Sequence, residues 1–304
     1  MKNLRRFVAV LSLGAILGAC GGPGSTFGDK KDQNDAAIVV AASFYPIAEI
    51  VEQVGGVNVQ VINLTPAGTD AHDVELTAKQ LQELQDAKIT FYLGEHFQPA
   101  INKAIESLKG QSFDLLKVTP AMGFTCGTCE PDPHVWLDPA NMILMTKEVS
   151  KQLSAARPEL AENFANNALA FEKELASVGN LIDTSFNKCE SQALVTSHYS
   201  FGYFATRANL NLSSLAPVDH EEELSAKEIE QLIQQLRSQK VTTIFSEQLV
   251  PSSSVATVAN NLNANVDVLQ PLEGITNSDL EAGKNYISAQ RDNIARIAKG
   301  LRCS

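Results

Sequence analysis

Apolar residues along this chain fall into short β-type runs that alternate with helical patterns. The runs rich in valine, isoleucine and leucine predict strands at residues 38–42, 59–62, 89–93, 115–118, 193–195, 212–215, 241–245 and 266–269. An alternation of strands and helices is typical of parallel sheets with helices on their faces. The pattern therefore predicts an α/β protein with two βα domains, each built on roughly four parallel strands.

One helical pattern is too long for an ordinary connection between strands. Pro158 interrupts the helix that Asp138 and Pro139 are suited to begin, and residues 159–186 then continue without a break. A helix of that length is suited to a rigid link between two domains. The predicted organisation is an N-terminal βα domain at 37–157, a linking helix at 158–187 and a C-terminal βα domain at 188–304.

The first 36 residues do not follow the strand and helix pattern. A cationic start, an apolar run at 7–17 and small residues before Cys20 predict an export signal at 1–19. The apolar run is about half of the ~20 residues that a membrane-spanning helix needs. Cys20 follows a Leu-x-x pattern that resembles a bacterial lipobox, in which the thiol is acylated; an ordinary signal peptide with a chance cysteine is the alternative. Residues 20–36 are polar and glycine-rich, which predicts a flexible tether.

Charge and cysteine content narrow the possible partners and the compartment. The formal charge of −11 argues against nucleic acid as a partner and is compatible with a cation. With Cys20 assigned to the lipid, four cysteines of an exported chain remain for disulfides, and three pairings are open. We favour Cys126 with Cys129 and Cys189 with Cys303, because the second pair would fix the C-terminus to the start of the second domain. A redox-labile, zinc-collecting loop is the alternative role for the Cys126–Cys129 segment.

Three of the five histidines lie in loops next to predicted strands. His72 follows the second strand, His134 precedes the helix at Asp138, and His198 follows the strand at 193–195. Open α/β sheets bind ligands at the carboxyl ends of their strands. A structural role, hydrogen-bonded in a loop, is the favoured interpretation of each histidine alone, but three imidazoles with one further donor suit a tetrahedral zinc site. His96 and His220 lie in polar stretches, where a solvated role is expected, and Trp136 is expected to pack beneath the metal loop.

Five motifs, in order along the chain, resemble the ZnuA-like (cluster A-I) zinc and manganese receptors of bacterial ABC importers. The motifs cover nearly everything after the tether and are Ser43-Phe44-Tyr45-Pro46, Gly68-Thr69-Asp70-Ala71-His72-Asp73, Asp132-Pro133-His134-Val135-Trp136-Leu137-Asp138-Pro139, Thr196-Ser197-His198 with Phe201-Gly202-Tyr203-Phe204, and Phe245-Ser246-Glu247-Gln248. The resemblance implies a metal site between two βα domains, with His72, His134 and His198 as ligands. It also implies a monomeric, lipid-anchored receptor outside the cytoplasm that delivers Zn²⁺ to a membrane permease.

The resemblance also bears on the metal and on the remaining donors. Manganese receptors of the family tend to have a carboxylate where this chain has His198, so imidazole there favours zinc over manganese or iron. Many members have an aspartate as fourth ligand after the last strand, whereas this chain reads Leu269-Gln270-Pro271-Leu272-Glu273-Gly274. Glu273 or a water molecule are the two candidates for that place. Glu247 is a candidate to accept the second N–H of a ligand histidine, or else is a capping or surface carboxylate.

Two other classes of protein compete with a metal receptor. A zinc hydrolase also uses three histidines and an open position, but the chain has no Gly-x-Ser-x-Gly or His-Glu-x-x-His motif and no carboxylate placed as a general base. We therefore expect no enzymatic activity. An adhesin, a label sometimes attached to this family, would not need three converging histidines.

Overall fold

The computed structural model describes residues 37–304, apart from 95–96, 109, 121–131, 217–224 and 249–252. The predicted signal peptide at 1–19, Cys20 and the tether lie outside the described residues, as do Cys126, Cys129, His96 and His220. Within the described part of the chain, no helix combines the length and the apolar character needed to cross a membrane.

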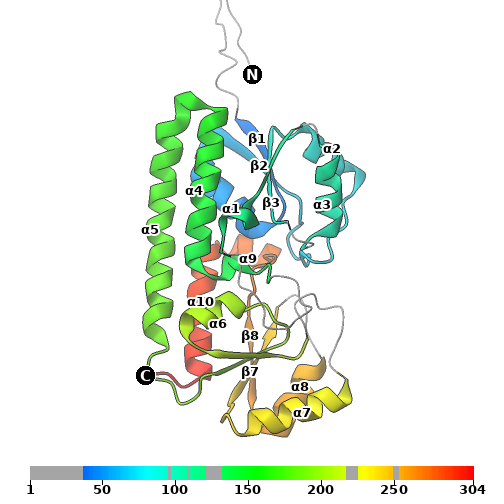
Figure 1. The fold of residues 1–304 in the computed structure, drawn as a ribbon, viewed down its shortest axis with the longest axis vertical. Coiled ribbons are helices and arrows are strands. Elements are labelled where there is room, and N and C mark those ends of the chain that lie inside the picture. Colours follow the sequence, from blue (N-terminus) through cyan, green and yellow to red (C-terminus); the bar gives the residue numbers. More distant parts are fainter. Residues whose placement is uncertain (1–36, 95–96, 109, 121–131, 217–224, 249–252) are drawn as a thin grey trace, which may run out of the picture. The chain divides into compact units, whose positions relative to one another are not determined.

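Two sheets of four parallel strands each form the centre of the described chain (Figure 1). The first sheet has the order β2-β1-β3-β4 and the second the order β6-β5-β7-β8. Their strands are β1 (Ile38–Ala42), β2 (Val59–Asn63), β3 (Ile89–Tyr92), β4 (Gln111–Asp114), β5 (Ala193–Thr196), β6 (Asn211–Ser214), β7 (Thr243–Glu247) and β8 (Asn265–Leu269). The predicted α/β class with two parallel sheets is confirmed.

In each sheet, the second and third strands along the chain lie on opposite sides of the first strand. β1 has β2 on one side and β3 on the other, and β5 has β6 on one side and β7 on the other. Ligands of open α/β sheets bind outside the carboxyl ends of the strands at such a switch point. The topology thus gives two equivalent switch points, one in each sheet.

The fourth predicted strand was wrong in its position. Leu115–Val118 is a 3₁₀ helix, and β4 is the polar segment just before it. Asp114 ends the strand, because its Oδ1 accepts the backbone N–H of Leu116 at 3.0 Å and that of Gly94 at 2.9 Å. Apolar content indicated a strand at 115–118, whereas this side-chain cap turns the chain into a helix. β7 likewise lies two residues beyond the predicted 241–245 and ends at Glu247.

Ten α-helices are described. They are α1 (Tyr45–Gly55), α2 (Ala78–Asp86), α3 (Pro99–Glu106), α4 (Pro139–Ala156), α5 (Ala161–Ser185), α6 (Gly202–Ala208), α7 (Ala226–Arg237), α8 (Ser253–Leu262), α9 (Asn277–Glu281) and α10 (Tyr286–Gly300). Short 3₁₀ helices lie at Gly56–Asn58, Leu115–Val118, Val135–Leu137 and Pro158–Leu160.

The long helix α5 connects the two sheets. Its 25 residues span roughly 37 Å at the rise of an α-helix. It packs along α4 and against α1 on the side of the first sheet, and against α6 and α10 on the side of the second (Figure 1). A long helix at this position was predicted; the domain limits at 37–157, 158–187 and 188–304 stay a prediction.

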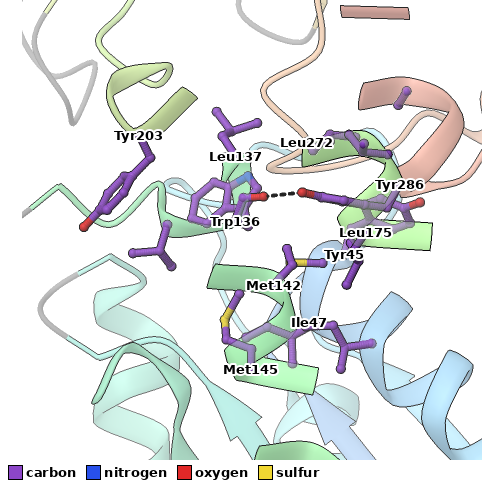
Figure 2. Packing of buried hydrophobic residues seen from close by; sticks show 14 of the residues in the cluster. Tyr45, Ile47, Trp136, Leu137, Met142, Met145, Leu175, Tyr203, Leu272 and Tyr286 are labelled. Atoms are coloured by element: carbon purple, nitrogen blue, oxygen red, sulfur yellow. Dashed lines mark hydrogen bonds between the residues drawn. The ribbon is translucent and has the colours of Figure 1, made fainter. Parts of the chain in front are cut away.

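One apolar core extends from the first sheet to the second. It includes Ile47 of α1, Met142 of α4, Leu175 of α5 and Tyr286 of α10, and all four side chains are fully buried. Figure 2 shows these side chains around Trp136, which is also fully buried. Burial of this continuous apolar surface stabilises the arrangement of the elements that carry the loops of the site.

The predicted disulfide between Cys189 and Cys303 is confirmed. It joins the segment after α5 to the residues after α10 and closes a loop with a sequence separation of 114. The predicted Cys126–Cys129 pair lies outside the described residues.

Candidate metal centre

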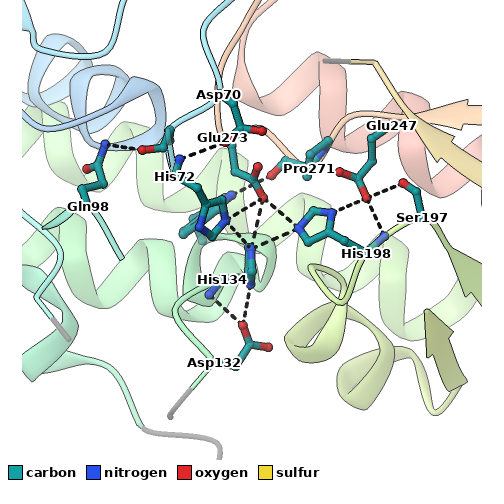
Figure 3. A network of polar contacts seen from close by, with 12 residues as sticks. Asp70, His72, Gln98, Asp132, His134, Ser197, His198, Glu247, Pro271 and Glu273 are labelled. Carbon is teal, nitrogen blue, oxygen red and sulfur yellow. Dashed lines mark hydrogen bonds and ion pairs between the residues drawn. The ribbon is translucent and has the colours of Figure 1, made fainter. Parts of the chain in front are cut away.

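Four side chains from four separate loops meet at one point of the described chain. His72 comes from the loop between β2 and α2, and His134 directly precedes the 3₁₀ helix Val135–Leu137. His198 follows β5 by two residues, and Glu273 lies in the loop after β8. The structure brings the three predicted histidines together with Glu273, one of the two candidates for the fourth donor (Figure 3).

The donor atoms of these four side chains all lie within 4.8 Å of one another. Nε2 of His134 is 3.4 Å from Nε2 of His72 and 3.4 Å from Nε2 of His198. Oε1 of Glu273 is 3.1 Å from Nε2 of His134, 3.3 Å from Nε2 of His198 and 3.8 Å from Nε2 of His72.

These separations can be compared with those of a small tetrahedral ion. Zinc-to-nitrogen bonds of ~2.0 Å at tetrahedral angles place neighbouring donor atoms about 3.3 Å apart. Five of the six separations among the four donor atoms lie between 3.1 and 3.8 Å and bracket that spacing. Three imidazoles and one carboxylate therefore form a set that fits a four-coordinate zinc ion without large rearrangement.

His198 is held from behind by Glu247. Thr196 at the end of β5 pairs with Phe245 of β7, so His198, two residues beyond β5, lies beside Glu247, the last residue of β7. Nδ1 of His198 donates to Oε1 of Glu247 at 2.5 Å, and Oγ of Ser197 donates to the same oxygen at 2.8 Å. This contact fixes the ring so that Nε2 points to the centre of the cluster, the arrangement expected of an imidazole ligand.

His134 is held in the same way by Asp132, a role that the sequence did not indicate. Oδ1 of Asp132 accepts from Nδ1 of His134 at 2.6 Å and from its backbone N–H at 2.9 Å, and both residues are fully buried. Gly202 of α6 faces Oδ2 of Asp132 so closely that a Cβ at this position would clash with it. The only available signal was the spacing Asp132-Pro133-His134, in which the carboxylate precedes the ligand by two residues.

His72 reaches the cluster from a loop and is the more accessible donor. Its side chain is 10% exposed, and its ring lies edge-on to Phe97 with centroids 4.8 Å apart. Its backbone N–H donates to Oδ1 of Asp70 at 2.9 Å. The buried Gln98 donates to the carbonyl of Ala71 at 3.2 Å and thereby supports the loop from the N-terminus of α3.

The carboxylates around the site change the protonation of the buried imidazoles. Burial lowers the pKa of His134, but the charge of Asp132 and hydrogen bonds to Asp132 and Glu273 outweigh it, so the pKa is raised. Burial likewise lowers the pKa of His198, and the charges of Glu247 and Glu273 raise it to about 10. Without a metal ion, a proton on His198 therefore balances the carboxylates at neutral pH. A bound cation takes over that role.

The donor set bears on whether the site holds an ion or activates a water molecule. Catalytic zinc sites have three protein ligands and leave the fourth position open for water or substrate. Here Oε1 of Glu273 lies at the distance of a fourth donor from the imidazole nitrogens. Phe97 packs against His72 with ring centroids 4.8 Å apart, and Trp136 packs against His134 with centroids 5.1 Å apart. Four protein donors, two of them packed against aromatic rings, favour holding an ion over activating a water molecule.

Two parallel βα arrays whose loops converge on three imidazoles and a carboxylate define the class: an α/β protein with a built site for one divalent transition-metal ion. Comparison with known proteins agrees with this class. A family model described as "zinc-uptake complex component A, periplasmic" (ZnuA) matches residues 40–300. The chain belongs to this ZnuA family.

The family includes characterised relatives with modest sequence identity. The zinc-binding lipoprotein AdcA of Streptococcus pneumoniae is 28% identical over 283 residues, which cover 88% of this chain and 56% of AdcA. The high-affinity zinc uptake system protein ZnuA of Bacillus subtilis is 26% identical over 301 residues, with 94% of each chain covered. The chain thus spans little more than half the length of AdcA and nearly the full length of the B. subtilis protein.

A solved structure supports the fold. The zinc-bound ZnuA-like domain of S. pneumoniae AdcA superposes with a TM-score of 0.75 at 27% identity, covering 88% of this chain and 99% of that domain.

Proposed function

We propose that this chain is an extracytoplasmic zinc receptor that binds one Zn²⁺ through His72, His134, His198 and Glu273 and delivers it to an ABC-type importer. The observation that carries the proposal is the convergence of these four donors within 4.8 Å. Membership of the ZnuA family and the names of the zinc-binding relatives support the choice of ion. Zn²⁺ is the cargo of this site, and no catalytic step is assigned to it.

The donor set favours zinc over manganese or iron. Manganese prefers oxygen ligands and a higher coordination number, whereas three of the four donors here are imidazole nitrogens. Cobalt, which accepts the same tetrahedral nitrogen-rich geometry, is expected to bind as a spectroscopic substitute.

The remaining parts of the proposal concern location and partners. The signal pattern at 1–19 and Cys20 support export and lipid attachment on the outer side of a membrane, and the relative AdcA is named a lipoprotein. A tether at 20–36 lets the folded chain dock on a membrane permease while it remains anchored. A monomer is sufficient for this role, because one chain supplies all four donors.

Titration calorimetry of residues 37–304 with zinc and manganese tests this proposal. We expect one zinc ion per chain, bound much more tightly than manganese, and a sharp loss of affinity in His72→Ala, His134→Ala and His198→Ala. His220→Ala is the matched control, because the sequence assigns that histidine no ligand role. Wild-type affinity in all three variants would contradict the proposed ligand set.

A screen for hydrolysis of carboxylic and phosphate esters by the zinc-loaded chain separates receptor from hydrolase. The closed four-donor set predicts no turnover above that of free zinc. Turnover that disappears in His134→Ala would favour the enzyme interpretation.

A further inference from the structure

Leu272 has a backbone conformation that its residue type disfavours. Its φ is +63°, in the left-handed region that non-glycine residues rarely adopt. The other described non-glycine residues with positive φ are Asn209, Lys240, Asn263 and Arg302. Those four are exposed and follow the ends of α6, α7, α8 and α10, where a left-handed residue is common. Leu272 follows a strand instead and is fully buried.

The loop around Leu272 is held at three points. Asn293 of α10 contacts Gln270 twice, accepting from its N–H at 3.0 Å and donating to its carbonyl at 2.7 Å. The indole Nε1 of Trp136 donates to the carbonyl of Pro271 at 2.7 Å. The carbonyl of Ile275 accepts from the N–H of Gly68 at 2.9 Å. A strained residue persists only where its surroundings determine it, and these contacts lie on both sides of Leu272.

The strained turn immediately precedes the carboxylate of the metal site. The unusual φ at Leu272 sets the direction in which the chain enters Glu273, whose side chain is 2% exposed and whose Oε1 lies 3.1 Å from Nε2 of His134. Residue Leu272 packs in the apolar core near Trp136 and Tyr286 (Figure 2).

Trp136 connects this turn to a second donor. Its ring is centred 5.1 Å from that of His134, and its carbonyl accepts from the hydroxyl of Tyr286 at 2.6 Å. The indole of Trp136 thus packs against one donor, His134, and holds the loop that carries the other, Glu273.

We propose that Leu272 and Trp136 are positioning residues that aim a single carboxylate oxygen of Glu273 at the three imidazoles. The left-handed turn at Leu272 sets the direction in which the side chain of Glu273 leaves the backbone. The hydrogen bond from the indole of Trp136 to Pro271 fixes the position of the loop that carries Glu273. Leu272 and Trp136 together hold Glu273 in place as fourth donor, although its side chain is longer than the aspartate that many family members have after the last strand. This inference rests on the proposed zinc-binding function.

A matched pair of substitutions at Leu272 isolates the backbone conformation from the packing. Leu272→Ile keeps the side-chain volume, but branching at Cβ makes a positive φ far more unfavourable. Leu272→Met keeps an unbranched Cβ and a similar volume. We expect the isoleucine variant to bind zinc roughly tenfold more weakly and the methionine variant to match the wild type.

A double-mutant cycle with Glu273→Ala shows whether Leu272 acts through the carboxylate. In the Glu273→Ala background, Leu272→Ile should have no further effect on zinc affinity, because there is no carboxylate to aim. Equal effects of Leu272→Ile in both backgrounds, or no effect of Glu273→Ala alone, would overturn the inference. Trp136→Phe, which lacks the indole donor, is tested in the same cycle and replaces Leu272→Ile if that variant does not fold.

The visible spectrum of the cobalt-loaded chain gives an independent readout. Tetrahedral Co²⁺ absorbs far more strongly than five- or six-coordinate Co²⁺, so Leu272→Ile should weaken the bands and Leu272→Met should not. Failure of the inference can be told apart from failure of the function. If the wild type binds zinc through its histidines but the cycle is additive, only the positioning role is wrong; if the wild type binds no zinc, the proposed function is wrong.

Discussion

The buried histidines His134 and His198 differ from His72 in how the fold holds them. Each of the two has a buried carboxylate behind its ring, Asp132 at 2.6 Å and Glu247 at 2.5 Å. His72 is 10% exposed, its backbone N–H donates to Asp70, and its ring lies edge-on to that of Phe97. Figure 3 shows the two carboxylates on the far sides of the rings from the point where the imidazoles meet.

The difference indicates two roles within one site. The pair His134 and His198 is fixed before an ion arrives, because each carboxylate sets the orientation of its ring. His72 lies in a loop and is more exposed than the other two histidines, so it is the donor that an incoming ion meets from the solvent side. We therefore expect all three histidines to matter for affinity and only the buried pair to matter for the stability of the metal-free fold.

The largest expected effects come from the histidines themselves. Replacement of any of the three by alanine removes one of four donors, and zinc affinity should fall by more than the ~100-fold that loss of a supporting contact can cost. The metal-free variants should differ from one another. His198→Ala leaves the buried Glu247 charge unpaired, which costs about 3 kcal/mol or more, whereas the partly exposed His72→Ala should cost far less.

Calorimetry for affinity and urea unfolding of the metal-free chain measure the two effects separately. Equal losses of unfolding free energy in His72→Ala and His198→Ala would remove the distinction between the two kinds of histidine.

The supporting carboxylates should have the next largest effect. Asp132→Asn and Glu247→Gln keep the shape of each side chain but remove the charge that orients the imidazole. We expect each to weaken zinc binding by roughly 10- to 100-fold. Asp73→Asn is the control on the His72 side, because Asp73 is an exposed carboxylate next to His72 in the same loop. A larger loss in the control than in Asp132→Asn would reverse the comparison.

The pH dependence follows from the raised pKa of His198. Its folded value is about 10, against an ordinary value of about 6.5. Protonation of His198 therefore stabilises the metal-free fold fully below pH ~6.5, and this contribution is lost as the pH rises towards the folded pKa. Zinc must displace the proton, so affinity should rise by about tenfold per pH unit over the same window.

Glu247→Gln tests the cause of this pH dependence. Without the carboxylate, the pKa of His198 drops and the rise in affinity above neutral pH should flatten. Titrations at several pH values, in buffers with different ionisation enthalpies, count the released protons directly. An unchanged slope in Glu247→Gln would show that Glu247 does not control the proton.

The smallest expected effect on zinc affinity belongs to the disulfide. Cys189→Ser with Cys303→Ser opens a loop with a sequence separation of 114, which should lower the free energy of unfolding by about 4 kcal/mol. Because neither cysteine contacts the four donors, the folded double variant should bind zinc as the wild type does. A large loss of affinity at a temperature where the variant is folded would link the disulfide to the site.

Sequence patterns sufficed for the fold wherever apolar residues dominate a strand. β1, β3 and β5 are buried and were placed within a residue or two. β4 reads Gln-Ser-Phe-Asp and is half-buried, so its composition gave no strand signal. Its existence depends on pairing with β3, a contact between distant residues that local propensity does not encode.

The site was predictable only in part, for a similar reason. Histidines in loops after strands are visible in the sequence, and parallel topology brings such loops to one edge. Asp132 supports His134 through a local turn, and the presence of an aspartate at this position does not by itself indicate that role. The left-handed conformation of Leu272 was hidden, because leucine rarely adopts it and contacts from Trp136 and Asn293 impose it. The assignment of the four donors as zinc ligands remains a prediction.

X-ray absorption at the zinc edge of the loaded chain tests the central claim most directly. We predict a four-coordinate ion with three imidazole nitrogens and one carboxylate oxygen, and loss of one imidazole in His72→Ala. A first shell that contains sulfur, or one with fewer than three imidazoles in the wild type, would contradict the account.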